Sequence, residues 1–236
     1  MNFYDHLQES TAQEREYLLA APIINNSLQG KITTAEYVAF LQQAYHHVKH
    51  TTPLLMATGS RLPDSKEWLR EAVAEYIEEE LGHQEWILND IVQCGGNREI
   101  ARNSRPNFAT ELMVSYAYDS INRISPLCFF GMVQVLEGTS IHIADLAAEK
   151  IQQTLGLPNQ AFSYLRSHGA LDQEHIQFFA KLMNRITDNQ DQSLIVHAAR
   201  CFYRLYGNVF RDIDAVQSEQ VLSNQSESSS TFKRVV

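Results

Sequence analysis

Three residues that could bind a metal recur at helical spacing in the segment HGALDQEH, residues 168–175. His168, Asp172 and His175 stand at i, i+4 and i+7, and at about 100° per residue the last two positions return to within roughly 40° of the first on a helix. The segment therefore predicts a strip of two imidazoles and one carboxylate. The alternative interpretation is a solvated polar edge on an amphipathic helix.

A second group of candidate ligands lies in EEELGHQEW, residues 78–86. His83 follows Glu80 at i+3 and Glu79 at i+4, so either glutamate can share a metal ion with it on a helix. Glu-x-x-His is the helical element of di-iron carboxylate bundles. A run of three glutamates is also typical of a solvated helix face. The choice between Glu79 and Glu80 stays open.

Glu137 is the one acid in the apolar segment CFFGMVQVLEGTSIHI, residues 128–143, which contains no lysine or arginine. A buried carboxylate without a counter-charge costs several kcal/mol or stays protonated. A metal ion would compensate this cost. The alternatives are a hydrogen-bonded core glutamate and a glutamate that faces a wet groove.

Three separate segments together supply six candidate ligands of two chemical types. Imidazoles and carboxylates suit iron or manganese, and the absence of thiolates argues against a structural zinc site. Six ligands are too many for one closed catalytic ion, but they suit two ions bridged by a carboxylate. The predicted metal ligands are Glu80 (or Glu79), His83, Glu137, His168, Asp172 and His175.

The order of these motifs resembles that of the haem-oxygenase-like di-metal oxidases, iron-containing redox enzymes allied to the TenA and PqqC proteins, over roughly residues 10–213. The resemblance implies a haem-oxygenase-like helical bundle with two Fe ions, O2 as co-substrate, a small organic substrate and a homodimer. It carries the ligand roles over to the six positions above, by position in this chain. Some members place the first glutamate seven residues before the histidine, where this chain has Tyr76; Tyr76 could instead line the pocket.

The substrate pocket and the rival functions depend on fewer residues. Tyr76, Tyr116, Phe129 and Phe130 are candidates for the pocket wall, with core packing as the alternative for each. Cys128 is the candidate nucleophile if the chain is a TenA-type thiaminase or hydrolase, which needs no metal. A PqqC-like cofactorless oxidase and a non-enzymatic helical metal-binding protein are the remaining alternatives.

Helical periodicity covers nearly the whole chain, and alternating strands are absent. With ten Gly and six Pro in 236 residues, the pattern predicts an all-α protein of about seven or eight helices. We expect a single helical domain at residues 1–214 and a polar, serine-rich, partly disordered tail at 215–236. The expected helices cover 3–20, 22–29, 33–59, 65–93, 104–123, 125–151, 157–186 and 191–213.

The composition bounds the partners and the compartment. Hydrophobic residues make up 44% and charged residues 20%, which is typical of a globular protein. The net charge of −9 argues against binding to nucleic acid or to anionic membranes. The chain shows no secretory signal pattern and no apolar run of ~20 residues. Its three cysteines lie far apart, so we expect them to be reduced, in a cytoplasmic protein.

Overall fold

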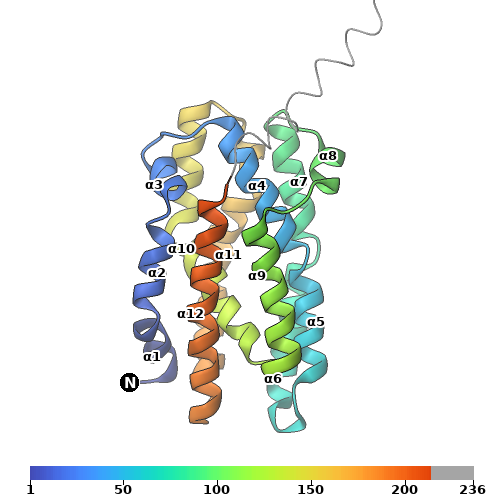
Figure 1. Ribbon diagram of the computed structural model, residues 1–236, viewed down its shortest axis with the longest axis vertical. Helices are drawn as coiled ribbons and strands as arrows, with labels where there is room; N and C mark the ends of the chain where they lie inside the picture. Colours follow the sequence, from blue (N-terminus) through green and yellow to red (C-terminus); the bar gives the residue numbers. More distant parts are fainter. Residues whose placement is uncertain (214–236) are drawn as a thin grey trace, which may run out of the picture.

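The structure is a computed structural model in which residues 1–213 are described, except for the side chains of residues 141–142 and 168–174. The predicted tail at 215–236 lies outside the described residues. Within 1–213 the chain forms twelve α-helices and no strand, which confirms the all-α class (Figure 1). The helices are α1 (Phe3–Ser10), α2 (Ala12–Leu19), α3 (Pro22–Leu28), α4 (Thr34–Val48), α5 (Thr51–Arg61), α6 (Glu67–Glu80), α7 (His83–Gln93), α8 (Arg98–Asn103), α9 (Phe108–Asp119), α10 (Cys128–Leu155), α11 (Ser163–Asn184) and α12 (Asn189–Arg211).

The described helices outnumber the expected ones because three of the expected long helices are each divided in two, and because α8 lies in a segment where no helix was expected. The segment 3–20 breaks at Thr11, whose hydroxyl donates to the Leu7 carbonyl at 2.8 Å. The segment 33–59 restarts because Pro53, in the first turn of α5, has no N–H for a continuous helix. The segment 65–93 breaks at Gly82, which has a φ of 91° that favours glycine.

Polar side chains cap the first turns of two further helices. Thr33 caps α4 in a capping box with Glu36, and the two side chains exchange hydrogen bonds with each other's backbone N–H. Asn107 caps α9, accepting from the Thr110 N–H at 2.8 Å. Helix α11 runs unbroken from Ser163 to Asn184.

The long helix α10 packs against both α11 and α12. In Figure 1 most helices run along the long axis of the bundle, and α1, α2 and α3 follow one another along its edge. Gly131 permits the close approach of α10 to α12, because a Cβ at this position would lie 2.6 Å from the Ala199 nitrogen. A side chain there would force the two helices apart.

Buried apolar side chains form two clusters that both border a cavity. Phe130, Phe179 and Phe202 belong to one cluster, and Tyr37 and Phe162 belong to the other. Members of both clusters contribute to the cavity wall. None of the described helices combines the length and the apolar character that crossing a membrane requires.

Candidate metal centre and its cavity

The first imidazole–carboxylate pair joins the end of α6 to the start of α7. Glu80 is the last residue of α6 and His83 the first of α7, and Glu80 Oε2 lies 3.1 Å from His83 Nδ1. His83 is 3% exposed, and its ring stacks on Trp86 with centroids 4.0 Å apart. The expectation of one continuous helix through this motif is wrong. The turn at Gly82, rather than helical i, i+3 spacing, brings the two donors together.

The second pair joins α6 to α11. Glu79 Oε2 lies 3.1 Å from His175 Nε2, and the two residues are 96 positions apart in the sequence. Glu79 and Glu80 are therefore not interchangeable candidates for one role. Each of them contacts a different histidine of the predicted ligand set, on a different helix.

Tyr76 lies between these pairs and Glu137. It is 3% exposed, and its ring meets that of His175 at 6.3 Å in an edge-on arrangement. Burial raises the pKa of Tyr76 far above its usual range, and the charges of Glu137, Glu79 and Glu80 raise it further. The hydroxyl stays protonated, and among the described residues it has no hydrogen-bond partner. A protonated donor thus stands among three carboxylates that come from two helices.

The remaining predicted ligands are on α10 and α11. Glu137 is partly buried in the middle of α10 and lines the cavity. The side chains of His168 and Asp172 lie outside the described residues, so their ligand roles stay predictions. Within the part of the chain whose side chains are described, no three such donors gather into one metal site; the two contacts given above are pairs.

Asp90 anchors the helix that carries three of the predicted ligands. It is fully buried on α7, and its carboxylate accepts from the Ser163 N–H at 3.1 Å and the Tyr164 N–H at 2.8 Å. The Ser163 hydroxyl donates to it as well. Burial raises the pKa of Asp90 above its usual value, although these hydrogen bonds lower it in part. The residue ties the first turn of α11 to the helix that begins with His83.

The cavity beside the acids has a volume of about 140 Å³. Helix α10 supplies one wall from Phe129 to Ile151, and α3, α4, α5, α6, α11 and α12 contribute the others. The wall is mainly aliphatic and aromatic. Glu80, Tyr76 and Glu137 stand at it together, so the candidate ligands open onto a largely apolar space.

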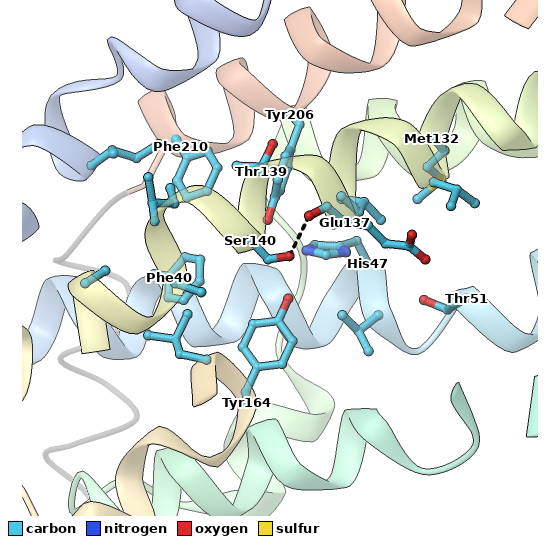
Figure 2. A pocket seen from close by; sticks show the side chains of 18 of the residues that line it. Phe40, His47, Thr51, Met132, Glu137, Thr139, Ser140, Tyr164, Tyr206 and Phe210 are labelled. Carbon is cyan, nitrogen blue, oxygen red and sulfur yellow. Dashed lines mark hydrogen bonds between the residues drawn. The ribbon is translucent and has the colours of Figure 1, made fainter. Parts of the chain in front are cut away.

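A group of polar side chains lies across the middle of this cavity. Figure 2 shows Tyr206 and Tyr164 pointing into the pocket from opposite sides, with Ser140 and His47 between them. His47 is buried, and its ring meets Tyr206 at 5.5 Å in an edge-on arrangement. In the same view Phe40 and Phe210 lie on one side of this group, and the carboxylate of Glu137 points to the other.

The predicted pocket residues divide into two pairs. Tyr76 and Phe129 line the cavity. Tyr116 and Phe130 do not, which corrects the prediction for both. Phe130 follows Phe129 by about 100° around α10 and is fully buried in the apolar core. Tyr116 lies on α9 and packs edge-on against Phe202 at 5.1 Å.

His47, Tyr164 and Tyr206 line the cavity and were not predicted as site residues. The signal for Tyr206 is a phenol in the apolar stripe of α12, one turn before Phe210. That stripe is as typical of core packing as of a pocket. His47 is one of three histidines close together in the sequence. Only the direction in which each ring leaves α4 distinguishes it from His46.

Comparisons with known proteins agree with this architecture. A family model described as "iron-containing redox enzyme" matches residues 38–207. None of the curated proteins matches the chain in sequence. A domain of unknown function with a haem oxygenase-like fold from Shewanella denitrificans is 24% identical, with a TM-score of 0.83 over 94% of this chain and 97% of that one.

More distant solved structures share the fold. A TenA homologue from P. horikoshii is 10% identical, with a TM-score of 0.75 over 92% of this chain and 100% of that one. Haem oxygenase-1 from the cyanobacterium Synechocystis, solved in complex with haem, is 12% identical, with a TM-score of 0.72 over 96% of this chain and 100% of that one. At these identities the likeness shows the haem-oxygenase-like fold.

Proposed function

Because the chain belongs to the family of iron-containing redox enzymes, we propose that it is a non-haem di-iron oxidase or oxygenase that uses O2 to oxidise a small organic substrate. The observation that supports this most directly is the pair of contacts Glu80–His83 and Glu79–His175, both at 3.1 Å, beside the cavity that Glu137 lines.

The donor chemistry fits iron. Each contact offers an imidazole nitrogen and a carboxylate oxygen, a set that suits iron and also permits manganese. The third carboxylate, Glu137, comes from α10 and faces the same cavity. We propose that His168 and Asp172 complete the set from α11. Asp90 holds the N-terminus of that helix against α7, and so fixes the position of His175 relative to His83.

When bound, iron supplies the electrons that reduce dioxygen during oxidation of the substrate. The chain's own residues set the conditions for that chemistry. The apolar wall excludes water from the cavity, which strengthens the electrostatic interactions inside it. Tyr76 keeps its proton and can donate a hydrogen bond to a carboxylate or to a bound molecule. Trp86 stacks on His83 and restricts the orientation of its ring.

The structure gives less support to a haem enzyme. A cavity of about 140 Å³ is smaller than the ~300–1,000 Å³ of pockets for drug-sized ligands. Two of the three clustered histidines have other contacts: His46 Nε2 lies 2.9 Å from Ser104 Oγ, and His50 Nδ1 lies 3.1 Å from Tyr118 Oη. Neither of these histidines is on the cavity wall.

The TenA-like neighbours raise the alternative of a cysteine nucleophile. Cys128 is buried at the first turn of α10, and it is not on the cavity wall. Burial raises the pKa of its thiol, which disfavours the reactive thiolate. These features support the metal-dependent reaction over the nucleophilic one.

The test is anaerobic loading with Fe(II), measurement of metal content, and optical spectroscopy during exposure to air. We expect two irons per chain and a spectral change that requires O2. Glu137→Ala should lose stoichiometric two-iron binding while staying helical by circular dichroism. Glu78→Ala removes an exposed carboxylate at the end of α6, next to Glu79 and Glu80, and serves as the control. His168→Ala and Asp172→Ala should each lose O2-dependent turnover.

Two results would contradict the proposal. A wild-type protein that takes up no iron, or whose Fe(II) is inert to air, would exclude an oxidase. Two tightly held irons in Glu137→Ala would remove Glu137 from the ligand set. Loading with Mn(II) in competition with Fe(II) would show which metal the site selects.

A further inference from the structure

The side chains of the cavity wall restrict the charge of the molecule that the cavity can bind. Among the described residues that line it, none is lysine or arginine, and the acids are Glu80 and Glu137. An anionic group placed away from the metal site would meet no counter-charge there. An ion buried without a partner is strongly disfavoured. The described wall therefore suits an uncharged molecule.

Most hydroxyl groups on the wall are already engaged by nearby carbonyl oxygens. Tyr37 donates to the Ala161 carbonyl at 2.8 Å. Thr139, Ser27 and Ser140 each donate to a carbonyl of their own helix, at 2.6, 2.8 and 3.0 Å. These groups give the cavity little capacity to bind a further polar atom.

Tyr206 differs from these hydroxyls. Its side chain is 7% exposed, yet within the described part of the chain its hydroxyl makes no hydrogen bond. Burial raises the pKa of Tyr206 well above its usual range, so the group remains a neutral donor. Figure 2 shows it pointing from α12 into the cavity toward Ser140. The hydroxyl faces the cavity with its donor unused, which makes it a candidate for binding a ligand oxygen.

The shape of the cavity limits the ligand further. Its wall on α10 extends from Phe129 to Ile151, which is about 33 Å at 1.5 Å per residue. A volume of about 140 Å³ spread along a wall of that length is narrow, and it suits a chain better than a fused ring system.

We propose that the site takes an uncharged, narrow, mainly hydrocarbon molecule whose single oxygen acceptor is bound by the Tyr206 hydroxyl. One arm of the molecule lies against the stacked rings of Phe40 and Phe210, and the other reaches toward Glu137. This assignment rests on the proposed function for the identity of the site, because it places the reacting part of the substrate beside the predicted metal ligands.

The experiment compares three nine-carbon probes: 5-nonanone, with a carbonyl at its centre; nonane, without oxygen; and nonanoate, which is charged. Headspace partitioning gives the affinity of the ketone and the alkane, and calorimetry gives that of the ketone and nonanoate. Both the metal-free and the iron-loaded full-length protein are titrated. We expect 5-nonanone to bind at least tenfold more tightly than nonanoate in each preparation.

Tyr206→Phe removes the donor and keeps the ring. We expect it to weaken the binding of 5-nonanone by about three- to tenfold, the range of a single hydrogen bond, and to leave the affinity for nonane unchanged. Tyr37→Phe is the matched control, because its hydroxyl is held by the Ala161 carbonyl. This variant should lose stability but keep the ratio of ketone to alkane affinity.

Three outcomes would overturn the assignment. Tighter binding of nonanoate than of the ketone would indicate an anionic substrate. An equal effect of Tyr206→Phe on ketone and alkane would mean that the hydroxyl serves packing or a bound water. Failure of all three probes to bind would mean that the cavity takes a different class of molecule. Iron uptake and air oxidation are measured on the same samples, so a failure of the oxidase proposal is seen separately from these results.

Discussion

Asp90 links the two halves of the candidate metal centre, and its replacement is the sharpest test of how the fold supports the site. Asp90→Ala would leave the Ser163 and Tyr164 N–H groups at the start of α11 without their acceptor. Loss of an N-terminal cap costs about 0.5–2 kcal/mol, and each buried donor left unsatisfied costs about 1–3 kcal/mol. Because these contributions overlap, we expect about 3 kcal/mol in total.

That magnitude is measurable by thermal unfolding. For a protein of this size 1 kcal/mol shifts Tm by about 2–4 °C, so Asp90→Ala should lower Tm by roughly 6–12 °C. The matched control is Asp188→Ala, which removes an exposed cap that accepts from the Gln190 and Asp191 N–H groups at the start of α12. Its cost should be ~1 kcal/mol. Iron content should fall in Asp90→Ala and stay unchanged in the control.

The pH dependence of stability shows whether the negative charge of Asp90 stabilises or destabilises the folded protein. The pKa of Asp90 is raised in the folded protein, so folding favours its protonated form. Its contribution to stability is complete below the unfolded pKa and is lost as the pH rises through the folded value. Asp90→Asn keeps one acceptor oxygen and carries no charge. Its stability relative to wild type should therefore increase as the pH rises from about 4.

The reasoning would be refuted by particular results. If Asp90→Ala lowers Tm no more than Asp188→Ala does, the buried carboxylate is not the anchor of α11. If Asp90→Asn becomes less stable relative to wild type as the pH rises, the charged carboxylate is favoured by folding and the sign is reversed. If Asp90→Ala is less stable but binds as much iron as the wild type, Asp90 anchors α11 without positioning the metal ligands.

Two further perturbations test the packing and the rejected nucleophile. Gly131→Ala places a Cβ 2.6 Å from the Ala199 nitrogen, so chemical denaturation should show a free energy of unfolding lower by about 1–3 kcal/mol. The control Gly138→Ala has contacts no shorter than 3.4 Å, and helix propensity should raise its free energy of unfolding by up to about 1 kcal/mol. Equal effects of the two substitutions would mean that α10 and α12 are not in close contact. Cys128→Ser should retain iron uptake and O2 reactivity. Loss of both in a variant with native circular dichroism would mean that Cys128 takes part in the reaction.

Local features of the chain determined the class of fold and the ends of several helices. Periodicity at 3.6 residues identifies helices from the chain itself, and Thr33 and Asn107 cap helices through contacts three residues away. The break at Gly82 was missed because a glycine in a helical pattern does not reveal its φ. Phe129 and Phe130 could not be told apart for a similar reason. They are adjacent in one apolar helix, and only the packing of the bundle decides which of them faces the cavity and which the core.

The sequence by itself also determined the chemistry available, because the types and local spacing of acids and imidazoles restrict the metals that a site can hold. Only the tertiary structure decided the pairing of Glu79 with His175, the anchoring of α11 by Asp90, and the position of Tyr206 in the cavity. Each of these depends on how helices distant in sequence pack together. Side-chain spacing along one helix carries no information on that packing.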